Sequence, residues 1–214
     1  MKNIVLLATR PGAGVHTIAL NLGIGLTHFQ KKVFLASDCV RLADWLNSPG
    51  HRENSLLDRN PAFSWQLLSD HNYDEAIASG SLDYRLYLQH GKNWPAGFPS
   101  QDRILALCVI DVSKADLPGI MALNQYLQEV RPDGRGIDLL VPNKVKPGEW
   151  SENSQLIFDL AEDLGWEKIA DPIPHCEALH DLPKEHTSVW ELPAQYNNRR
   201  AAFQRLVDRV LEMI

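Results

Sequence analysis

Two kinds of hydrophobic pattern alternate along the chain. Short, nearly continuous apolar runs predict buried strands at 4–8, 33–36, 104–110 and 137–141. Segments whose apolar residues recur every three or four positions predict helices at 15–30, 117–130, 151–164 and 196–214. Strands that alternate with helices are typical of a parallel sheet with helices on both faces. We therefore predict a single α/β domain over residues 1–214, with a mostly parallel sheet of about six to eight strands.

The segment 47–81 has no sustained period, and we interpret it as the variable surface of the domain. Two short helical pieces are predicted within it, at 63–68 and 73–78. Two further strands are predicted outside it, at 82–89 and at 168–170.

Composition and charge limit the class of protein. The hydrophobic content of 44% and the charged content of 22% are ordinary for a globular domain. The net charge of −6 argues against a surface that coats nucleic acid in general but leaves a local basic patch open, and we expect no specific nucleic-acid partner. The widely spaced Cys39, Cys108 and Cys176 predict free thiols in a reducing compartment. The first apolar run is too short for a signal peptide or a membrane span, so we expect a cytoplasmic protein. The scattered histidines show no ligand spacing, and no metal site is predicted.

The residues Arg-Pro-Gly-Ala-Gly-Val-His-Thr at 10–17 lie between the first predicted strand and the first predicted helix. A strand, a glycine-containing turn and a helix together direct backbone N–H groups at a phosphate. The usual phosphate-binding pattern is G-x-x-x-x-G-K-[ST]. Aligned on Gly14, this chain has Val15 at the lysine position and His16 at the magnesium-binding hydroxyl. The loop is therefore retained, while most of its chemistry is replaced.

The loop resembles the variant P-loop of the ParA/MinD family of partitioning and positioning ATPases, which reads K-G-G-x-G-K-[ST]. Arg10 stands at the signature lysine, Gly12 and Gly14 match the glycines, and Pro11 replaces a glycine. The residues that follow, Thr17-Ile18-Ala19-Leu20-Asn21-Leu22, resemble the first helix of that family. The resemblance implies a single-domain P-loop NTPase-like fold.

Two further motifs of the family are altered in this chain. Ser37 and Cys39 stand at the aspartate positions of the motif D-x-D, and Leu88 or Gln89 stands at the Walker B aspartate. Asp111, at the end of another apolar run, is a second candidate for that carboxylate, although the order of strands favours Gln89. Phosphoryl transfer requires a lysine, magnesium ligands and a positioned water. These replacements predict a protein that hydrolyses ATP very slowly or not at all.

The motifs that contact the nucleotide base in the family are better preserved. Asn143-Lys144 matches h-h-h-N-[RK]-h (h, hydrophobic), whose asparagine reads the purine; a turn asparagine beside a proline is the alternative interpretation. Pro172-Ile173-Pro174 resembles the P-x-I-P segment on the other side of the base. The candidate nucleotide-binding residues are Arg10, Gly12, Ala13, Gly14, Val15, His16, Thr17, Asn143, Pro172 and Pro174.

These observations lead to one functional expectation and two alternatives. We expect a scaffold for positioning or assembly that hydrolyses ATP weakly or not at all and that retains at most weak ATP or ADP binding. The first alternative is a nucleotide-binding switch with slow ATP hydrolysis. The second is a Rossmann-type dinucleotide-binding protein, because Gly12-Ala13-Gly14 with Asp38 imitates the dinucleotide fingerprint.

The resemblance also implies partners. Relatives with altered motifs include the TadZ/CpaE, cellulose-synthesis and flagellar-placement branches, which act in bacterial envelope or pole systems. We expect a homodimer, or a heterodimer with an active homologue, whose protein contacts include Arg10 and Arg41. The helix at 196–214 has an apolar stripe (Phe203, Leu206, Val207, Val210, Leu211 and Ile214) that we expect to pack on the sheet. The alternative is contact with a membrane surface, which implies a peripheral location at the inner membrane or the pole.

Overall fold

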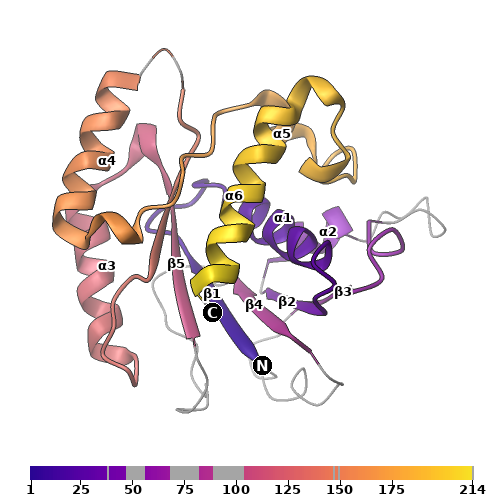
Figure 1. Ribbon diagram of the computed structural model, residues 1–214, viewed down its shortest axis with the longest axis horizontal. Helices are drawn as coiled ribbons and strands as arrows, with labels where there is room; N and C mark the ends of the chain where they lie inside the picture. Colours follow the sequence, from indigo (N-terminus) through magenta and orange to yellow (C-terminus); the bar gives the residue numbers. More distant parts are fainter. Residues whose placement is uncertain are drawn as a thin grey trace.

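A six-stranded parallel sheet runs through the centre of the protein (Figure 1). The computed structural model describes residues 1–37, 39–46, 56–67, 82–88, 104–146, 148 and 150–213. The strands are β1 (Lys2–Leu7), β2 (Val33–Ser37), β3 (Phe63–Leu67), β4 (Tyr84–Leu88), β5 (Ile104–Asp111) and β6 (Leu139–Asn143). Their order in the sheet is β3-β2-β4-β1-β5-β6, and every pairing is parallel. The predicted parallel α/β sheet is confirmed.

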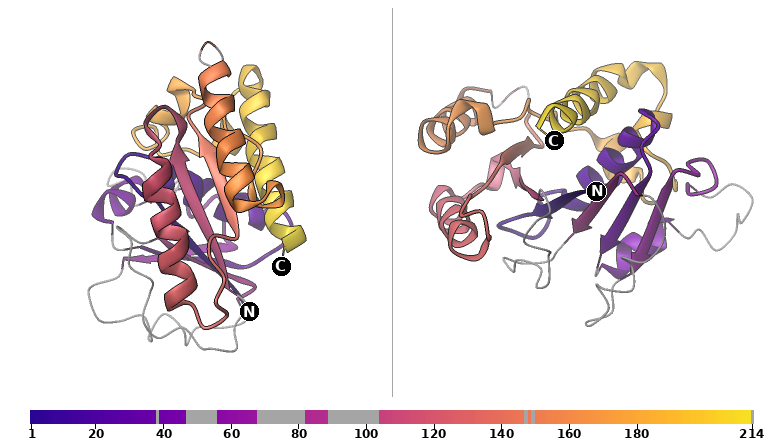
Figure 2. Two further views of the ribbon diagram at one scale, coloured as in Figure 1. Left: turned by 90° about the vertical axis from the view of Figure 1, so that its left-hand side faces the viewer. Right: turned by 60° about the horizontal axis from the view of Figure 1, so that its bottom comes forward.

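Helices cover both faces of the sheet, as predicted (Figure 2). The α-helices are α1 (Val15–Thr27), α2 (Val40–Leu46), α3 (Leu117–Val130), α4 (Trp150–Leu164), α5 (Glu177–Asp181) and α6 (Asn197–Met213). Short 3-10 turns form η2 (Val112–Lys114), η4 (Trp166–Lys168), η5 (Val189–Glu191) and η6 (Ala194–Tyr196). Side chains of β1 alternate between two cores: Ile4 and Leu6 pack with α1 and α6, whereas Val5 and Leu7 pack with α3 and α4.

Helix α6 packs beside α1 (Figure 1) rather than presenting its apolar stripe at the surface. Phe203, Leu206, Val207 and Val210 are buried, and Leu211 is half-buried. Gly25 of α1 permits the close approach, because a Cβ atom there would lie 2.6 Å from the side chain of Val207. The expected packing of this helix is confirmed for its described residues; Ile214 lies outside them.

The arginines of α6 contact the protein itself, in contrast to the headgroup-facing role of the membrane alternative. Arg199, Arg200 and Arg209 donate to backbone oxygens, and Arg205 pairs with Asp171 at 2.6 Å. The helix therefore has intramolecular contacts on both its apolar and its basic side.

Three predictions about local structure are wrong. Residues 63–67 form strand β3 instead of a helix, because the aromatic side chains and the hydrogen bonds to β2 favour the extended state. The segment 168–170 forms only an isolated bridge between Ile169 and Leu140 after η4. Helix α1 ends at Thr27, so Phe29 lies in a turn and is 39% exposed. The piece predicted at 73–78 lies outside the described residues.

The strand order also rejects the dinucleotide alternative. In the usual dinucleotide-binding order 3-2-1-4-5-6, the first and second strands are neighbours. Here β4 lies between β1 and β2 and pairs with both. The glycines that imitate the dinucleotide fingerprint therefore belong to a different topology, and Asp38, the other part of that pattern, lies outside the described residues.

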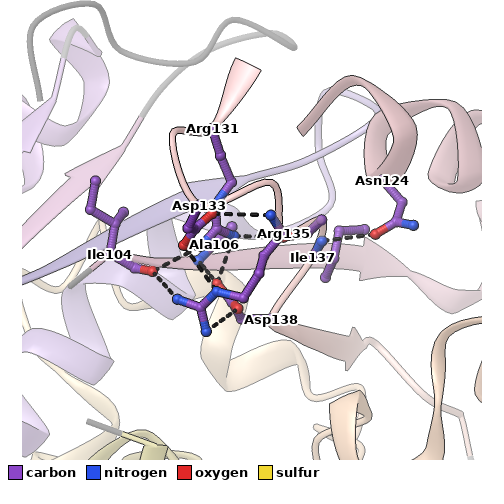
Figure 3. A network of polar contacts seen from close by, with 9 residues as sticks. Ile104, Ala106, Asn124, Arg131, Asp133, Arg135, Ile137 and Asp138 are labelled. Atoms are coloured by element: carbon purple, nitrogen blue, oxygen red, sulfur yellow. Dashed lines mark hydrogen bonds and ion pairs between the residues drawn. The ribbon is translucent and has the colours of Figure 1, made fainter. Parts of the chain in front are cut away.

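A buried charged network lies where strands β5 and β6 begin (Figure 3). The side chain of Arg131, just after α3, is 1% exposed. Its guanidinium donates to the backbone oxygens of Gly136 (2.6 Å) and Ile104 (3.0 Å) and pairs with the carboxylates of Asp138 (2.7 Å) and Asp133 (2.9 Å). Asp138 in turn accepts a 2.8 Å bond from the backbone N–H of Ala106. The network joins the end of α3 to two strands.

All three cysteines are free thiols, as predicted. Cys39 and Cys108 are buried, and Cys176 is half-buried. Burial raises the pKa of the Cys108 thiol to about 12, so this thiol is protonated at neutral pH.

Candidate functional site

The candidate site begins where β1 ends and the chain turns into α1. Gly12 and Gly14 have φ angles of 80° and 94°, a region that non-glycine residues rarely adopt. Gly14 is the N-cap of α1, and Val15 is the first residue of the helix. The strand, loop and helix predicted around 10–17 are therefore confirmed as structure.

Asn143 braces this loop from the end of β6. Its side chain is buried, and its Nδ2 donates a 2.8 Å hydrogen bond to the backbone oxygen of Ala13. A Cβ atom at Gly14 would lie 2.2 Å from Nδ2, so only glycine permits this approach. Asn143 is thus more than a turn residue, because it holds the loop in place. Its expected reading of a purine base stays a prediction.

Lys144 brings a cation into the loop from the same strand end. Its Nζ donates to the backbone oxygen of Gly12 and pairs with Asp111 Oδ2 at 3.1 Å. Its side chain is 36% exposed, and its φ of 60° is left-handed. Sequence reasoning treated Lys144 only as part of a motif and did not place it at the site. The available signal was its position directly after Asn143.

Asp111 lies at the end of β5, in register with Asn143 of β6. Its carboxylate accepts a 2.8 Å hydrogen bond from Ser113 Oγ in addition to the contact with Lys144. Burial alone would raise the pKa of Asp111, but the hydrogen bonds from Ser113 and Lys144, with the nearby lysine charges, lower it below its usual value. The carboxylate is therefore ionised at neutral pH and engaged by neighbouring side chains.

A cavity of about 720 Å³ opens beside the loop. It lies between the loop, α2, the end of β6 and the segment around α5. Its described lining consists of Ala8, Thr9, Arg10, Pro11, Gly12, Gly14, Val15, His16, Thr17, Cys39, Val40, Arg41, Leu42, Trp45, Asn143, Lys144, Pro174, His175, Cys176, Leu179, His180 and Pro183. The volume is within the usual range of small-molecule sites, about 300–1,000 Å³.

Most of the predicted site residues meet at this cavity, and two do not. Ala13 is buried behind the loop and contributes its carbonyl oxygen to Asn143. Pro172 is not among the described residues that line the cavity, whereas Pro174 lines it and bridges to Val145. Arg41, predicted as a partner contact, lines the cavity from α2. Most of the residues predicted to bind nucleotide and the two arginines predicted to contact a partner therefore line the same cavity.

The charges around the cavity favour an anion. Arg10, Arg41 and Lys144 line it, together with three histidines, and its described lining contains no aspartate or glutamate. Arg10 is exposed and donates a 2.7 Å hydrogen bond to the backbone oxygen of Lys114. A concave surface lined by charges of one sign attracts ligands of the opposite sign.

The positions that support hydrolysis in ordinary P-loop enzymes hold other chemistry here. Val15 is apolar and packs partly on the core. Ser37 is fully buried, and its hydroxyl accepts a 3.1 Å hydrogen bond from the N–H of Cys39. Leu88 is buried at the end of β4, and Gln89 lies outside the described residues. The described part of the site therefore offers the loop and its cations, without the usual lysine or the aspartates of the second motif.

Among the described residues, no group of three or more histidine, cysteine, aspartate or glutamate side chains is placed to hold a metal ion. Within the same residues, no helix has the length and apolar character needed to cross a membrane.

Comparison with solved structures identifies the fold. MinD from Aquifex aeolicus has a TM-score of 0.67 and 19% identity, with 99% of this chain and 97% of that chain covered. A plasmid partition protein from Borrelia burgdorferi bound to AMPPNP has a TM-score of 0.71 and 11% identity, with 100% and 99% covered. The ATP complex of Cyanothece McdA carrying D38A has a TM-score of 0.66 and 17% identity, with 98% and 96% covered.

No protein-family model and no curated protein matches the sequence. The structural likeness covers nearly the whole of both chains in each case, at identities below 20%. The chain therefore has the ParA/MinD-type P-loop fold, as the sequence motifs predicted.

Proposed function

We propose that this chain is a ParA/MinD-like scaffold for positioning or assembly that hydrolyses ATP very weakly or not at all. The observation that carries the proposal is the combination of an intact, braced P-loop with Val15 at the position of its lysine. The loop retains the geometry for contact with an anion or a partner, while the group that stabilises a transferring phosphoryl is replaced by an apolar side chain.

Slow hydrolysis follows from the number of groups that are replaced together. Each charge-assisted hydrogen bond lost costs roughly 1.5–3 kcal/mol. Lysine, magnesium ligands and a positioned water act as one unit in phosphoryl transfer, so the loss of several removes most of the rate. The carboxylate of Asp111 does not restore this unit in the ligand-free protein, because Lys144 and Ser113 engage it.

The proposed scaffold acts through the face around the loop. Arg10 and Arg41 are exposed there and line one cavity. We infer a homodimer, or a heterodimer with an active homologue, that recruits proteins of a bacterial envelope or pole system from the cytoplasmic side. The choice of system is an analogy from the fold.

The test of the scaffold compares two double charge reversals. Arg10→Glu with Arg41→Glu is expected to abolish self-association or partner cross-links, measured by light scattering and cross-linking mass spectrometry. Lys31→Glu with Lys32→Glu changes the charge equally at the opposite edge of the sheet, where β2 begins, and is expected to change neither. A monomer whose cellular position and cross-links are the same in all three proteins contradicts the proposal.

The second candidate function is a nucleotide-binding switch with slow hydrolysis. The cation-lined cavity beside the loop favours it over a nucleotide-blind scaffold. Calorimetric titration with ATP and ADP in the presence of Mg²⁺ separates the two, because the switch binds and the nucleotide-blind scaffold does not. Phosphate release that Gly14→Val abolishes contradicts the non-hydrolysing assignment.

A further inference from the structure

A cation that contacts the backbone of the loop comes from a different part of the chain than the P-loop lysine does. Position 15 is a valine, and the Lys144 ammonium instead reaches the backbone oxygen of Gly12 from the end of β6. Lysine is a compact charge on a flexible stem, so its Nζ can move from this carbonyl to a ligand nearby. Lys144 also lines the cavity and keeps 36% of its side chain exposed.

The backbone holds Lys144 in an unusual conformation at this place. Its φ of 60° is left-handed, which few residues other than glycine, asparagine and aspartate adopt. Hydrogen bonds on both sides fix it: Ile173 N donates to Pro142 O at 2.8 Å, and Val145 N donates to Ile173 O at 3.1 Å. Conformations of this kind persist where the surroundings determine them, and they gather at ligand-binding sites.

Asp111 competes for the same ammonium. Its Oδ2 lies 3.1 Å from Lys144 Nζ and holds the lysine while no anion is bound. A phosphate that takes over the ammonium must replace this contact, and the carboxylate also repels the phosphate. Asp111 therefore lowers the affinity of the loop for an anion.

The other cations of the cavity are placed differently. Arg10 donates a hydrogen bond to the backbone oxygen of Lys114, which lies outside the loop. Arg41 lines the cavity from α2, rather than from the end of β6. In the part of the chain that the structure describes, Lys144 is the one of these three cations that donates to a backbone oxygen of the loop.

We propose that Lys144 takes the place of the missing P-loop lysine and binds the phosphate of a phosphate-bearing ligand in this cavity, with Asp111 holding the lysine until the ligand enters. The turn of Gly12 and Gly14 offers backbone N–H groups to the same phosphate. The inference rests on the proposed function in one respect, that the loop face serves as a recognition surface.

The experiment is calorimetric titration of the full chain with inorganic pyrophosphate and, separately, with ADP. Lys144→Asn removes the charge and keeps a residue that tolerates the left-handed conformation, so we expect affinity for both probes to fall tenfold or more. Lys144→Arg keeps the charge and is expected to stay within about threefold of the natural protein. Asp111→Asn frees the ammonium and is expected to raise affinity about two- to fivefold.

The matched control is Lys32→Asn, which removes an exposed lysine before β2, at the opposite edge of the sheet. Its affinity for both probes is expected to equal that of the natural protein. Circular dichroism establishes that each variant is folded. If Lys144→Asn does not fold, Lys144→Gly suits the left-handed backbone and carries the same expectation. The two probes separate the sources of binding, because pyrophosphate lacks the purine base that ADP carries.

Three results overturn the inference: no binding of either probe by the natural protein, natural affinity in Lys144→Asn, or weaker binding in Asp111→Asn. None of them contradicts the scaffold proposal, which is tested by cross-links and self-association. Conversely, rapid ATP turnover contradicts the scaffold proposal and leaves Lys144 as the phosphate-binding cation. The two proposals therefore fail on different measurements.

Discussion

Two cations of this protein contact backbone oxygens and carboxylates at opposite ends of the strands, one where strands begin and the other where they end. Arg131 lies where β5 and β6 begin, in a network whose guanidinium contacts two carbonyls and two carboxylates (Figure 3). Lys144 lies where β6 ends, with one carbonyl and one carboxylate. The Arg131 side chain is 1% exposed, and that of Lys144 is 36% exposed beside a cavity of about 720 Å³.

The difference separates a structural charge from one available to a ligand. A buried guanidinium that is surrounded by acceptors is costly to disturb, because its partners would be left without a counter-charge. A half-exposed ammonium with two partners can exchange one of them for a ligand at little cost to the fold. The comparison predicts that changes around Arg131 lower the stability of the fold, and that changes around Lys144 affect mainly ligand binding.

Removing the buried cation has the largest expected effect. Arg131→Met leaves the 7%-exposed Asp138 without its buried partner, and we expect the free energy of unfolding to fall by about 3–5 kcal/mol. Urea denaturation measures it. The matched control is Arg135→Met. Arg135 belongs to the same network, because it pairs with Asp133 at 2.9 Å and with Asp138 at 3.3 Å, but its side chain is 48% exposed, and its removal should cost at most about 1 kcal/mol. Equal losses in the two variants would contradict the contrast between buried and exposed charges.

Two glycines of the loop beside Lys144 test how much this part of the protein also contributes to stability. Gly14→Ala combines a φ of 94° with a Cβ atom 2.2 Å from Asn143 Nδ2, so we expect a loss of about 2–3 kcal/mol. Gly12→Ala carries a φ of 80° with nothing within 4 Å and should cost only about 1 kcal/mol. Urea denaturation compares the pair.

The background Asn143→Ala makes this prediction sharper. If the clash with the amide causes the difference between the two glycines, Gly14→Ala should cost about as much as Gly12→Ala in that background. A difference that persists unchanged would assign the effect to the backbone alone.

A fall in pH has the smallest expected effect on stability, and it acts at both ends of the strands. Asp133 beside Arg131 and Asp111 beside Lys144 have pKa values below their usual 3.8 in the folded protein. In both cases burial raises the pKa, but hydrogen bonds and nearby positive charges outweigh burial and lower it. The hydrogen bonds come from Arg135 and Arg131 for Asp133, and from Ser113 and Lys144 for Asp111. The unfolded chain therefore binds protons more readily. The stabilisation is complete above the unfolded value and is lost as the pH falls through the lowered folded value.

Urea midpoints measured from about pH 6 down to about pH 3 test this expectation. Asp111→Asn and Asp133→Asn should each lose less stability on acidification than the natural protein, by less than about 1 kcal/mol because these pairs are partly exposed. A variant that loses more stability than the natural protein in this window would reverse the sign of the linkage.

The sequence by itself determined the centre of this fold. The apolar runs gave β1, β2 and β5, and the helical period gave α3 at its observed bounds, because burial of continuous or periodic apolar residues is a local signal. The glycine pattern at 10–17 likewise placed the loop between β1 and α1. These elements follow from properties of neighbouring residues.

Tertiary structure decided what local pattern could not. Residues 63–67 form a strand because β2 offers them hydrogen bonds, although a short helical piece is predicted at 63–68. Lys144 reaches Gly12 across 132 residues of chain, and Asp111 meets Lys144 because β5 and β6 are in register. Contacts of this kind depend on strand order and on backbone angles such as the left-handed φ of Lys144. Neither is written in the spacing of hydrophobic residues, because that spacing reports only which face of an element is buried.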